Sequence, residues 1–216
     1  MYRYYRYKTE RPHYDADKKF YVCSSGGCAS QMICHYLGNF GDVYHLHSRQ
    51  PPIKLTNTGY DDNKTYAEWF SNLEIPDNEL YKYKVIFLYR NPLEVIYSRY
   101  IDAPNMLKNV QCKDIDITVA DCIAAKKDLF ELEDFFDNYT NSVNQTRNYP
   151  IYCVKYAELF DNISQFNQIF SIPNIATLYP TKCEKNKDTE TISLTLKEIY
   201  KPFNTKIEAM KFIEIR

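Results

Sequence analysis

Residues 83–100, YKVIFLYRNPLEVIYSRY, predict the centre of an α/β fold. The apolar run VIFLY at 85–89 is typical of a strand buried on both faces of a parallel sheet. Arg90 ends the run, Asn91 is a helix-capping residue, and Pro92 suits a first helical position. We therefore expect a cation at the carboxyl end of a strand, beside a helix N-terminus, where α/β folds bind anions. The alternative is a buried strand whose arginine only caps the sheet edge.

A second stretch, KFYVCSSGGCASQMICHYL at 19–37, has the pattern of a strand, a small-residue loop and a helix. Residues 20–23 are the expected strand, residues 24–29 the loop, and Ser30 the start of the helix. Glycines allow the backbone to approach an anion closely, so this loop is a candidate phosphate cradle. It is not the ATP-binding GxxxxGK[ST] loop, because no lysine follows the glycines. A tight turn that simply needs glycine is the alternative.

These two stretches together resemble PAPS-dependent sulfotransferases, where PAPS is 3′-phosphoadenosine 5′-phosphosulfate. Arg-Asn-Pro with Ser98 eight residues after Arg90 resembles the segment that binds the 3′-phosphate, and residues 24–30 resemble the 5′-phosphosulfate loop. Tyr156, Glu158 and Leu159 resemble a further family segment, and the C-terminal pattern resembles the family's last helix. The resemblance implies a three-layer fold of the P-loop NTPase type, with a mostly parallel central sheet flanked by helices.

The resemblance also implies roles for individual residues. Arg90 and Ser98 would hold the 3′-phosphate, and the 5′-phosphosulfate would lie on the loop residues Ser25, Gly26, Gly27, Cys28, Ala29 and Ser30. His47 is the candidate general base, because many sulfotransferases place a catalytic histidine or acid just after the strand expected after Gly41. His45 shares the same strand face and is the reserve. The alternative is a pair of partly exposed surface histidines. PAPS would be the sulfuryl donor, PAP (the 3′,5′-bisphosphate) the product, and no metal is implied.

The loop departs from the family at Ser25, where a lysine or arginine usually stands. That cation stabilises the charge that develops on the leaving phosphate. A borrowed cation is therefore expected, and Arg49, just beyond the histidine strand, is the first candidate. Lys18 and Lys19 are weaker candidates, because they precede the first strand at its opposite end.

The remaining patterns predict helices and an arm. Thr118 and Asp121 resemble a capping box that opens a long helix through about Asn138, and residues 192–210 predict a helical region interrupted at Pro202. A short helix is expected at residues 66–73. Residues 1–17 are expected to form a flexible or docked arm on a single domain spanning residues 1–216.

Composition limits the function classes. The 216 residues suit one α/β domain, and the formal net charge of −1 gives no case for nucleic acid or a membrane as partner. No transmembrane run or signal peptide is predicted, and seven cysteines without CxxC spacing fit free thiols, so the cytoplasm of a cell, or of an infected host, is expected. The partner would be a hydroxyl-bearing acceptor such as a sugar, a protein tyrosine, or a small alcohol or phenol. A catalytically inactive PAP-binding module, a P-loop kinase and a protein that binds nucleic acid through the N-terminal arm remain alternatives, and the oligomeric state is open.

Overall fold

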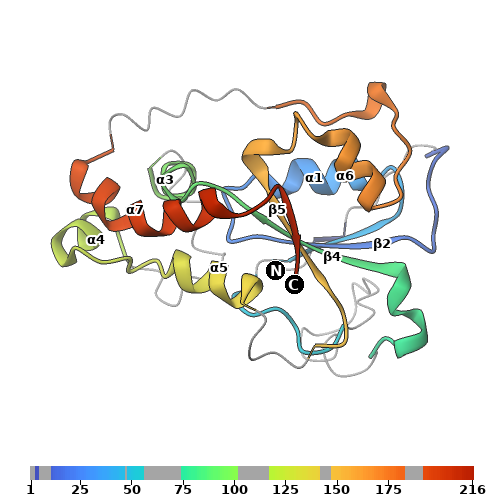
Figure 1. Cartoon of the computed structure of the whole chain (residues 1–216), viewed down its shortest axis with the longest axis horizontal. Helices are drawn as coiled ribbons and strands as arrows, with labels where there is room; N and C mark the ends of the chain where they lie inside the picture. Colours follow the sequence, from blue (N-terminus) through green and yellow to red (C-terminus); the bar gives the residue numbers. More distant parts are fainter. Residues whose placement is uncertain are drawn as a thin grey trace.

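The computed structural model describes residues 3–4, 11–46, 48–55, 74–101, 117–141, 147–182 and 192–216. They form an α/β protein around a mostly parallel sheet in the order β3-β2-β4-β5-β6 (Figure 1). The strands are β2 (Lys19–Cys23), β3 (Asp42–Leu46), β4 (Tyr83–Tyr89), β5 (Ile151–Lys155) and β6 (Ile213–Ile215). The two-residue β1 (Arg3–Tyr4) extends the β3 edge, and β1 and β6 both pair antiparallel to their neighbours.

The strand order places a topological switch between β2 and β4. The chain leaves β2 towards β3 on one side, whereas β4 lies on the other side of β2 and is parallel to it. Connections that diverge in this way leave a crevice at the carboxyl ends of the two strands, which is where open α/β sheets bind ligands. The loop at 24–29 and the Arg90–Asn91 junction both lie at this crevice.

Helices cover both faces of the sheet (Figure 1). On one face lie α1 (Ser30–Leu37) and α6 (Ile163–Ile169), which are joined by a hydrogen bond of 2.7 Å from Tyr36 to Asn167. On the other face lies α5 (Leu132–Thr140), where the Tyr139 ring stacks on Phe87 of β4 with centroids 4.4 Å apart. The core is therefore the two apolar layers above and below β4, which is buried as the sequence predicts.

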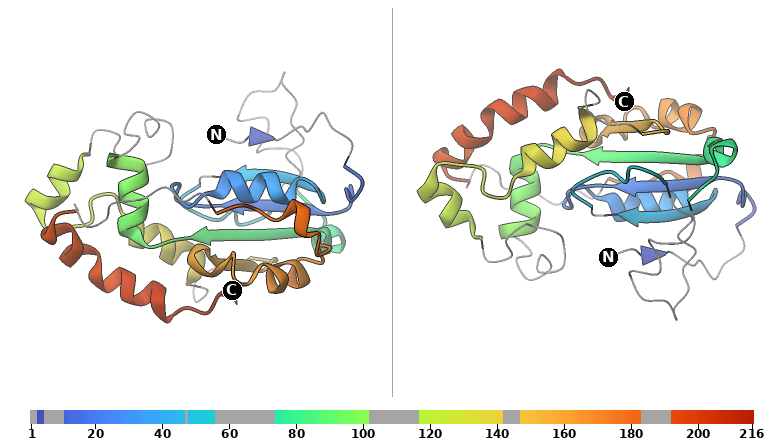
Figure 2. Two further views of the ribbon diagram at one scale, coloured as in Figure 1. Left: turned by 90° about the horizontal axis from the view of Figure 1, so that it is seen from above. Right: turned by 90° about the horizontal axis from the view of Figure 1, so that it is seen from below.

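The other helices gather near the carboxyl ends of the strands. Figure 2 shows α3 (Pro92–Ile96), α4 (Val119–Ala125) and the first turns of α7 (Leu194–Ala209) beyond the head of the β4 arrow. A π-helix at Tyr97–Ile101 continues α3. Short 3-10 helices occupy Asp77–Lys82, Tyr156–Glu158 and Ala176–Leu178.

Two predicted helices differ from the structure. The capping box of Thr118 and Asp121 is confirmed, but the expected long helix breaks into α4 and α5, because Lys126 and Glu131 adopt left-handed φ angles of 50° and 52°. Asp128 lies in the break and accepts hydrogen bonds from the first amides of α5. The expected interruption at Pro202 is also wrong, because α7 continues through it; the proline is exposed while Phe203 and Ile207 are buried. The expected helix at 66–73 lies outside the described residues.

Candidate functional site

The loop after β2 has a backbone that depends on glycine. Gly26 and Gly27 adopt φ angles of 88° and 66°, and Ala29 follows at 56°, directly before α1 begins at Ser30. L-amino acids with a side chain rarely adopt such angles, whereas glycine adopts them without a steric penalty to the backbone conformation. The turn brings the N-terminus of α1 to the switch point, and the first amides of a helix are a favourable place for an anion.

A buried polar chain supports this loop from beneath. His45 Nε2 lies 2.8 Å from Ser30 Oγ, Ser24 Oγ donates to Ser30 Oγ at 3.0 Å, and the amide of Gly26 donates to Ser24 Oγ at 3.2 Å. The His45 side chain lies on the face of β3 that α1 covers, and only 3% of it is exposed. The surface alternative is therefore excluded for His45, whose described contact is with the loop serine. It holds the loop and the start of α1 in place.

Arg90 lies where the sequence predicts it, at the carboxyl end of β4. Asn91 caps α3 by accepting a hydrogen bond of 2.9 Å from the amide of Leu93, and Pro92 is the first helical residue. The Arg90 guanidinium lies 4.5 Å from the centre of the Tyr156 ring and forms an ion pair with Glu94. Its Nε is buried and has no hydrogen-bond partner among the described residues.

The π-helix after α3 carries the second predicted phosphate ligand, Ser98, to the glycine loop. A Cβ atom placed on Gly27 would lie 3.4 Å from Ser98 Cβ and 3.2 Å from the carbonyl oxygen of Val95. Gly27 therefore packs directly against the α3 segment, and the two predicted phosphate-binding stretches meet here.

Arg99, which the sequence reasoning did not select, is the cation that contacts the loop. Its Nη1 donates to the carbonyl oxygen of Ser25, and a Cβ atom on Gly26 would lie 3.0 Å from Arg99 Cζ. Only 6% of Arg99 is exposed, and its Nη2 is buried without a hydrogen-bond partner in the described part of the chain. An arginine next to a candidate serine is a weak signal. In a regular α-helix adjacent side chains point about 100° apart, so spacing alone does not place both on one loop.

Ser25 and Arg90 both line a small, mostly apolar cavity of about 10 Å³. Its other walls are Phe87, Tyr89, Pro92, Val95, Leu132, Phe136 and Phe203. This volume is about that of a single water-sized probe. Ser25 connects the two arginine-bearing elements. It lines the cavity together with Arg90, and its carbonyl oxygen accepts a hydrogen bond from Arg99.

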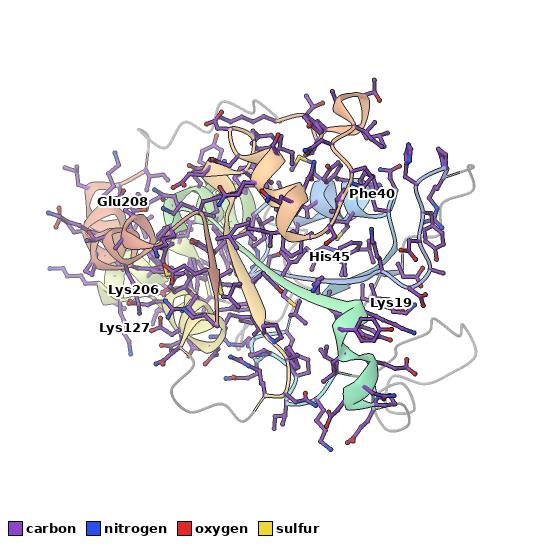
Figure 3. All side chains as sticks on the ribbon, turned by 45° about the vertical axis from the view of Figure 1, so that its right-hand side comes forward. Lys19, Phe40, His45, Lys127, Lys206 and Glu208 are labelled. Carbon is purple, nitrogen blue, oxygen red and sulfur yellow. The ribbon has the colours of Figure 1, made fainter. Side chains whose placement is uncertain are left out.

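Arg49, the expected borrowed cation, is paired elsewhere. Its guanidinium lies 2.7 Å from a carboxylate oxygen of Glu131, just before α5, and its backbone carbonyl accepts a hydrogen bond from Asn138. Lys18 and Lys19 bind Ser171 and Asp42 near the amino ends of the strands, as predicted. Figure 3 shows Lys19 on the opposite side of the molecule from Lys127 and Lys206. His47 lies outside the described residues.

Two buried cysteines of the central sheet, Cys23 and Cys153, have thiols of low reactivity. Burial raises the pKa of the Cys23 thiol, directly before the loop, to about 12, and burial likewise raises the pKa of Cys153 to about 12. A thiol with such a pKa stays protonated at neutral pH, and the thiolate is the reactive form. These two thiols therefore belong to the core.

Two features are absent from the described part of the chain. It contains no group of three or more histidine, cysteine, aspartate or glutamate side chains placed to hold a metal ion. None of its helices combines the length and the apolar character needed to span a membrane. What the described residues bring together is a glycine loop, a helix N-terminus, a serine and two arginines.

In comparisons with known proteins, no family model, no curated protein and no solved structure matches the chain.

Proposed function

We propose that the protein is a sulfotransferase that takes a sulfuryl group from PAPS and moves it to a hydroxyl acceptor. The observation that carries this proposal is the meeting of Arg90 and Ser98 with the glycine loop at the switch between β2 and β4. A nucleotide with separate 3′- and 5′-phosphate groups matches two anion-binding elements that lie side by side. A nucleotide phosphorylated only on its 5′ side would leave the Arg90 side of the site unused.

Two observations support the fit of the described residues to PAPS. The loop has the glycine backbone of a phosphate cradle, with positive φ angles at Gly26 and Gly27, and the Arg99 guanidinium packs directly against it. The buried Nε of Arg90 has no hydrogen-bond partner within the described segments, and a buried donor without an acceptor is costly. A phosphate oxygen is the acceptor that an arginine fork best recognises.

The proposed roles combine these positions with the sequence resemblance, and His47, which lies outside the described residues, takes its role from the resemblance alone. Arg90 and Ser98 hold the 3′-phosphate, and the amides that follow Gly27 at the start of α1 hold the 5′-phosphosulfate. When bound, PAPS supplies a sulfuryl group whose bond to the 5′-phosphate oxygen breaks as the acceptor oxygen bonds to sulfur, and PAP leaves. His47 takes the proton of the acceptor hydroxyl. His45 keeps the loop in position through Ser30.

Binding must rearrange the Arg90 side of the site. The cavity of about 10 Å³ is far too small for an adenosine, so that group lies outside it. Glu94 holds the Arg90 guanidinium in an ion pair, and a phosphate must compete with this carboxylate. Arg90 is therefore pre-positioned but partly neutralised, which makes affinity sensitive to salt and to Glu94.

Thermal unfolding with PAP and with ADP tests the donor assignment. We expect PAP to raise the melting temperature more than ADP does, because only PAP carries a 3′-phosphate; a ligand at one hundred times its dissociation constant adds about 2.7 kcal/mol. Arg90→Ala should remove the preference for PAP. Arg216→Ala, which removes an arginine paired with Glu214 on β6, is the matched control and should keep it. Equal shifts for PAP and ADP in the wild-type protein would refute the assignment.

Transfer of labelled sulfate from PAPS to a panel of sugars, phenols and tyrosine peptides tests catalysis. His47→Ala should lower transfer by roughly a hundredfold or more and leave PAP binding nearly unchanged. Tight PAP binding without transfer to any acceptor would identify a binding module and refute the catalytic part of the proposal.

A further inference from the structure

Arg99 is the one arginine of the site whose charge has no acidic partner among the described residues. Arg90 is paired with Glu94 and Arg49 with Glu131, whereas the described contacts of Arg99 are the Ser25 carbonyl oxygen and the Tyr100 ring at 5.5 Å. A guanidinium carries its positive charge at every relevant pH. A buried charge without a counter-ion is strongly unfavourable, so the fold holds Arg99 at the loop against a cost.

We propose that Arg99 supplies the positive charge that the loop lacks at Ser25, and that it binds the group on the 5′ side of the nucleotide. This inference rests on the proposed function for the identity of the nucleotide, but its geometry does not. Nη1 already donates to the Ser25 carbonyl oxygen, which holds the guanidinium against the loop. Nη2, on the same rigid fork, is a buried donor to which the described residues offer no acceptor.

The glycines of the loop fit this role. Cβ atoms built on Gly26 and Gly27 would lie 3.0 Å from Arg99 Cζ and 3.1 Å from Arg99 Cγ, so both glycines leave room for the arginine. The loop thus receives its cation from the segment after β4 instead of from its own sequence. The π-helix at Tyr97–Ile101 is the local feature that carries Ser98 and Arg99 together to the loop. Single π-turns within helices are frequent at functional sites.

The two arginines therefore divide the nucleotide between them. Arg99, on the loop side, reads the 5′-phosphate, and Arg90, on the strand side, reads the 3′-phosphate. A structural alternative is that Arg99 only ties the loop to the π-helix through Ser25. That role needs one neutral donor, and it gives no reason for one phosphate to be affected more than the other.

Removing one phosphate from the ligand and one charge from the protein separates these alternatives. Calorimetric titrations use PAP, adenosine 3′-monophosphate, adenosine 5′-monophosphate and inorganic pyrophosphate. The variants are Arg99→Gln, which keeps a donor for Ser25, and Arg90→Gln as the matched control. In the wild-type protein the 5′-phosphate should raise affinity roughly ten- to a hundredfold, measured as PAP against adenosine 3′-monophosphate. Arg99→Gln should remove most of that gain and keep the gain from the 3′-phosphate, and Arg90→Gln should do the reverse.

The outcomes decide between the inference and its basis. Equal losses for both phosphates in Arg99→Gln, an unchanged gain from the 5′-phosphate, or no binding of any ligand including pyrophosphate would overturn the role of Arg99. If the wild-type protein binds PAP and adenosine 5′-monophosphate equally while Arg99→Gln loses the 5′ gain, the role of Arg99 stands and the sulfotransferase proposal fails. Should Arg99→Gln not fold, Arg99→Lys replaces it. This variant keeps the charge and loses the fork, so it should reduce only the gain from the 5′-phosphate, and an equal reduction for both phosphates would overturn the inference.

Discussion

Gly26→Ala perturbs the loop at the point where its backbone and Arg99 constrain each other. The left-handed φ of 88° costs an alanine about 1–2 kcal/mol. The new methyl group would also lie 3.0 Å from Arg99 Cζ, so the guanidinium must move and weaken its hydrogen bond to Ser25, at a further cost of about 1 kcal/mol. We expect a total loss of about 2–3 kcal/mol in the free energy of unfolding, or about 4–12 °C in melting temperature for a chain of this size.

The assay is urea unfolding of the wild type, Gly26→Ala, Arg99→Ala and the double variant. In the Arg99→Ala background the steric part disappears, and Gly26→Ala should cost about 1 kcal/mol less than in the wild type. Ala29→Gly is the matched control, because Ala29 already adopts a left-handed φ of 56°; it should stay within about 1 kcal/mol of the wild type. A Gly26→Ala protein as stable as the wild type, or a cost independent of Arg99, would refute this description of the loop.

Three further predictions concern the surroundings of the loop. Glu94→Gln frees Arg90 from its ion pair and should raise PAP affinity about threefold or more at low salt, measured by calorimetry; a loss of affinity would contradict the competition described above. His45→Ala leaves the buried Ser30 hydroxyl without its histidine partner and should lower the free energy of unfolding by about 1–3 kcal/mol in urea. If the losses from His45→Ala and Ser30→Ala add up in the double variant, the two side chains are not coupled. Burial raises the pKa of Asp128 above the value of about 3.9 in the unfolded chain, so the folded protein takes up this proton at a higher pH than the unfolded chain does. The stability of the wild type relative to Asp128→Asn should therefore increase as the pH falls from 7 towards 4. A stability difference that does not change with pH would argue against a raised pKa.

Much of the fold could be predicted because local patterns agree with tertiary packing. The apolar run before Arg90 is a strand buried on both faces, and Asn91 and Pro92 start the next helix as their chemistry requires. The loop with two glycines followed by Ser30 also forms as expected. These elements depend on hydrophobic periodicity, capping and backbone freedom, which act over a few residues.

The elements that were missed depend on contacts distant in sequence. The predicted helix from Thr118 breaks because Asp128 caps a second helix while Tyr200 of α7 donates to the same carboxylate. The interruption expected at Pro202 is overridden by buried residues of α7. Arg99 could not be selected by spacing, because a π-turn changes which side chains share a face. Arg49 was chosen for its nearness in sequence to the histidine strand, but Glu131 binds it.

A crystal structure of the protein with PAP tests the central claim most directly. We predict one PAP at the carboxyl ends of β2 and β4, with its 5′-phosphate on the amides after Gly27 and on Arg99 Nη2, and its 3′-phosphate on Arg90 and Ser98. A nucleotide bound away from the loop, or one whose 3′-phosphate makes no contact with Arg90, would contradict the account.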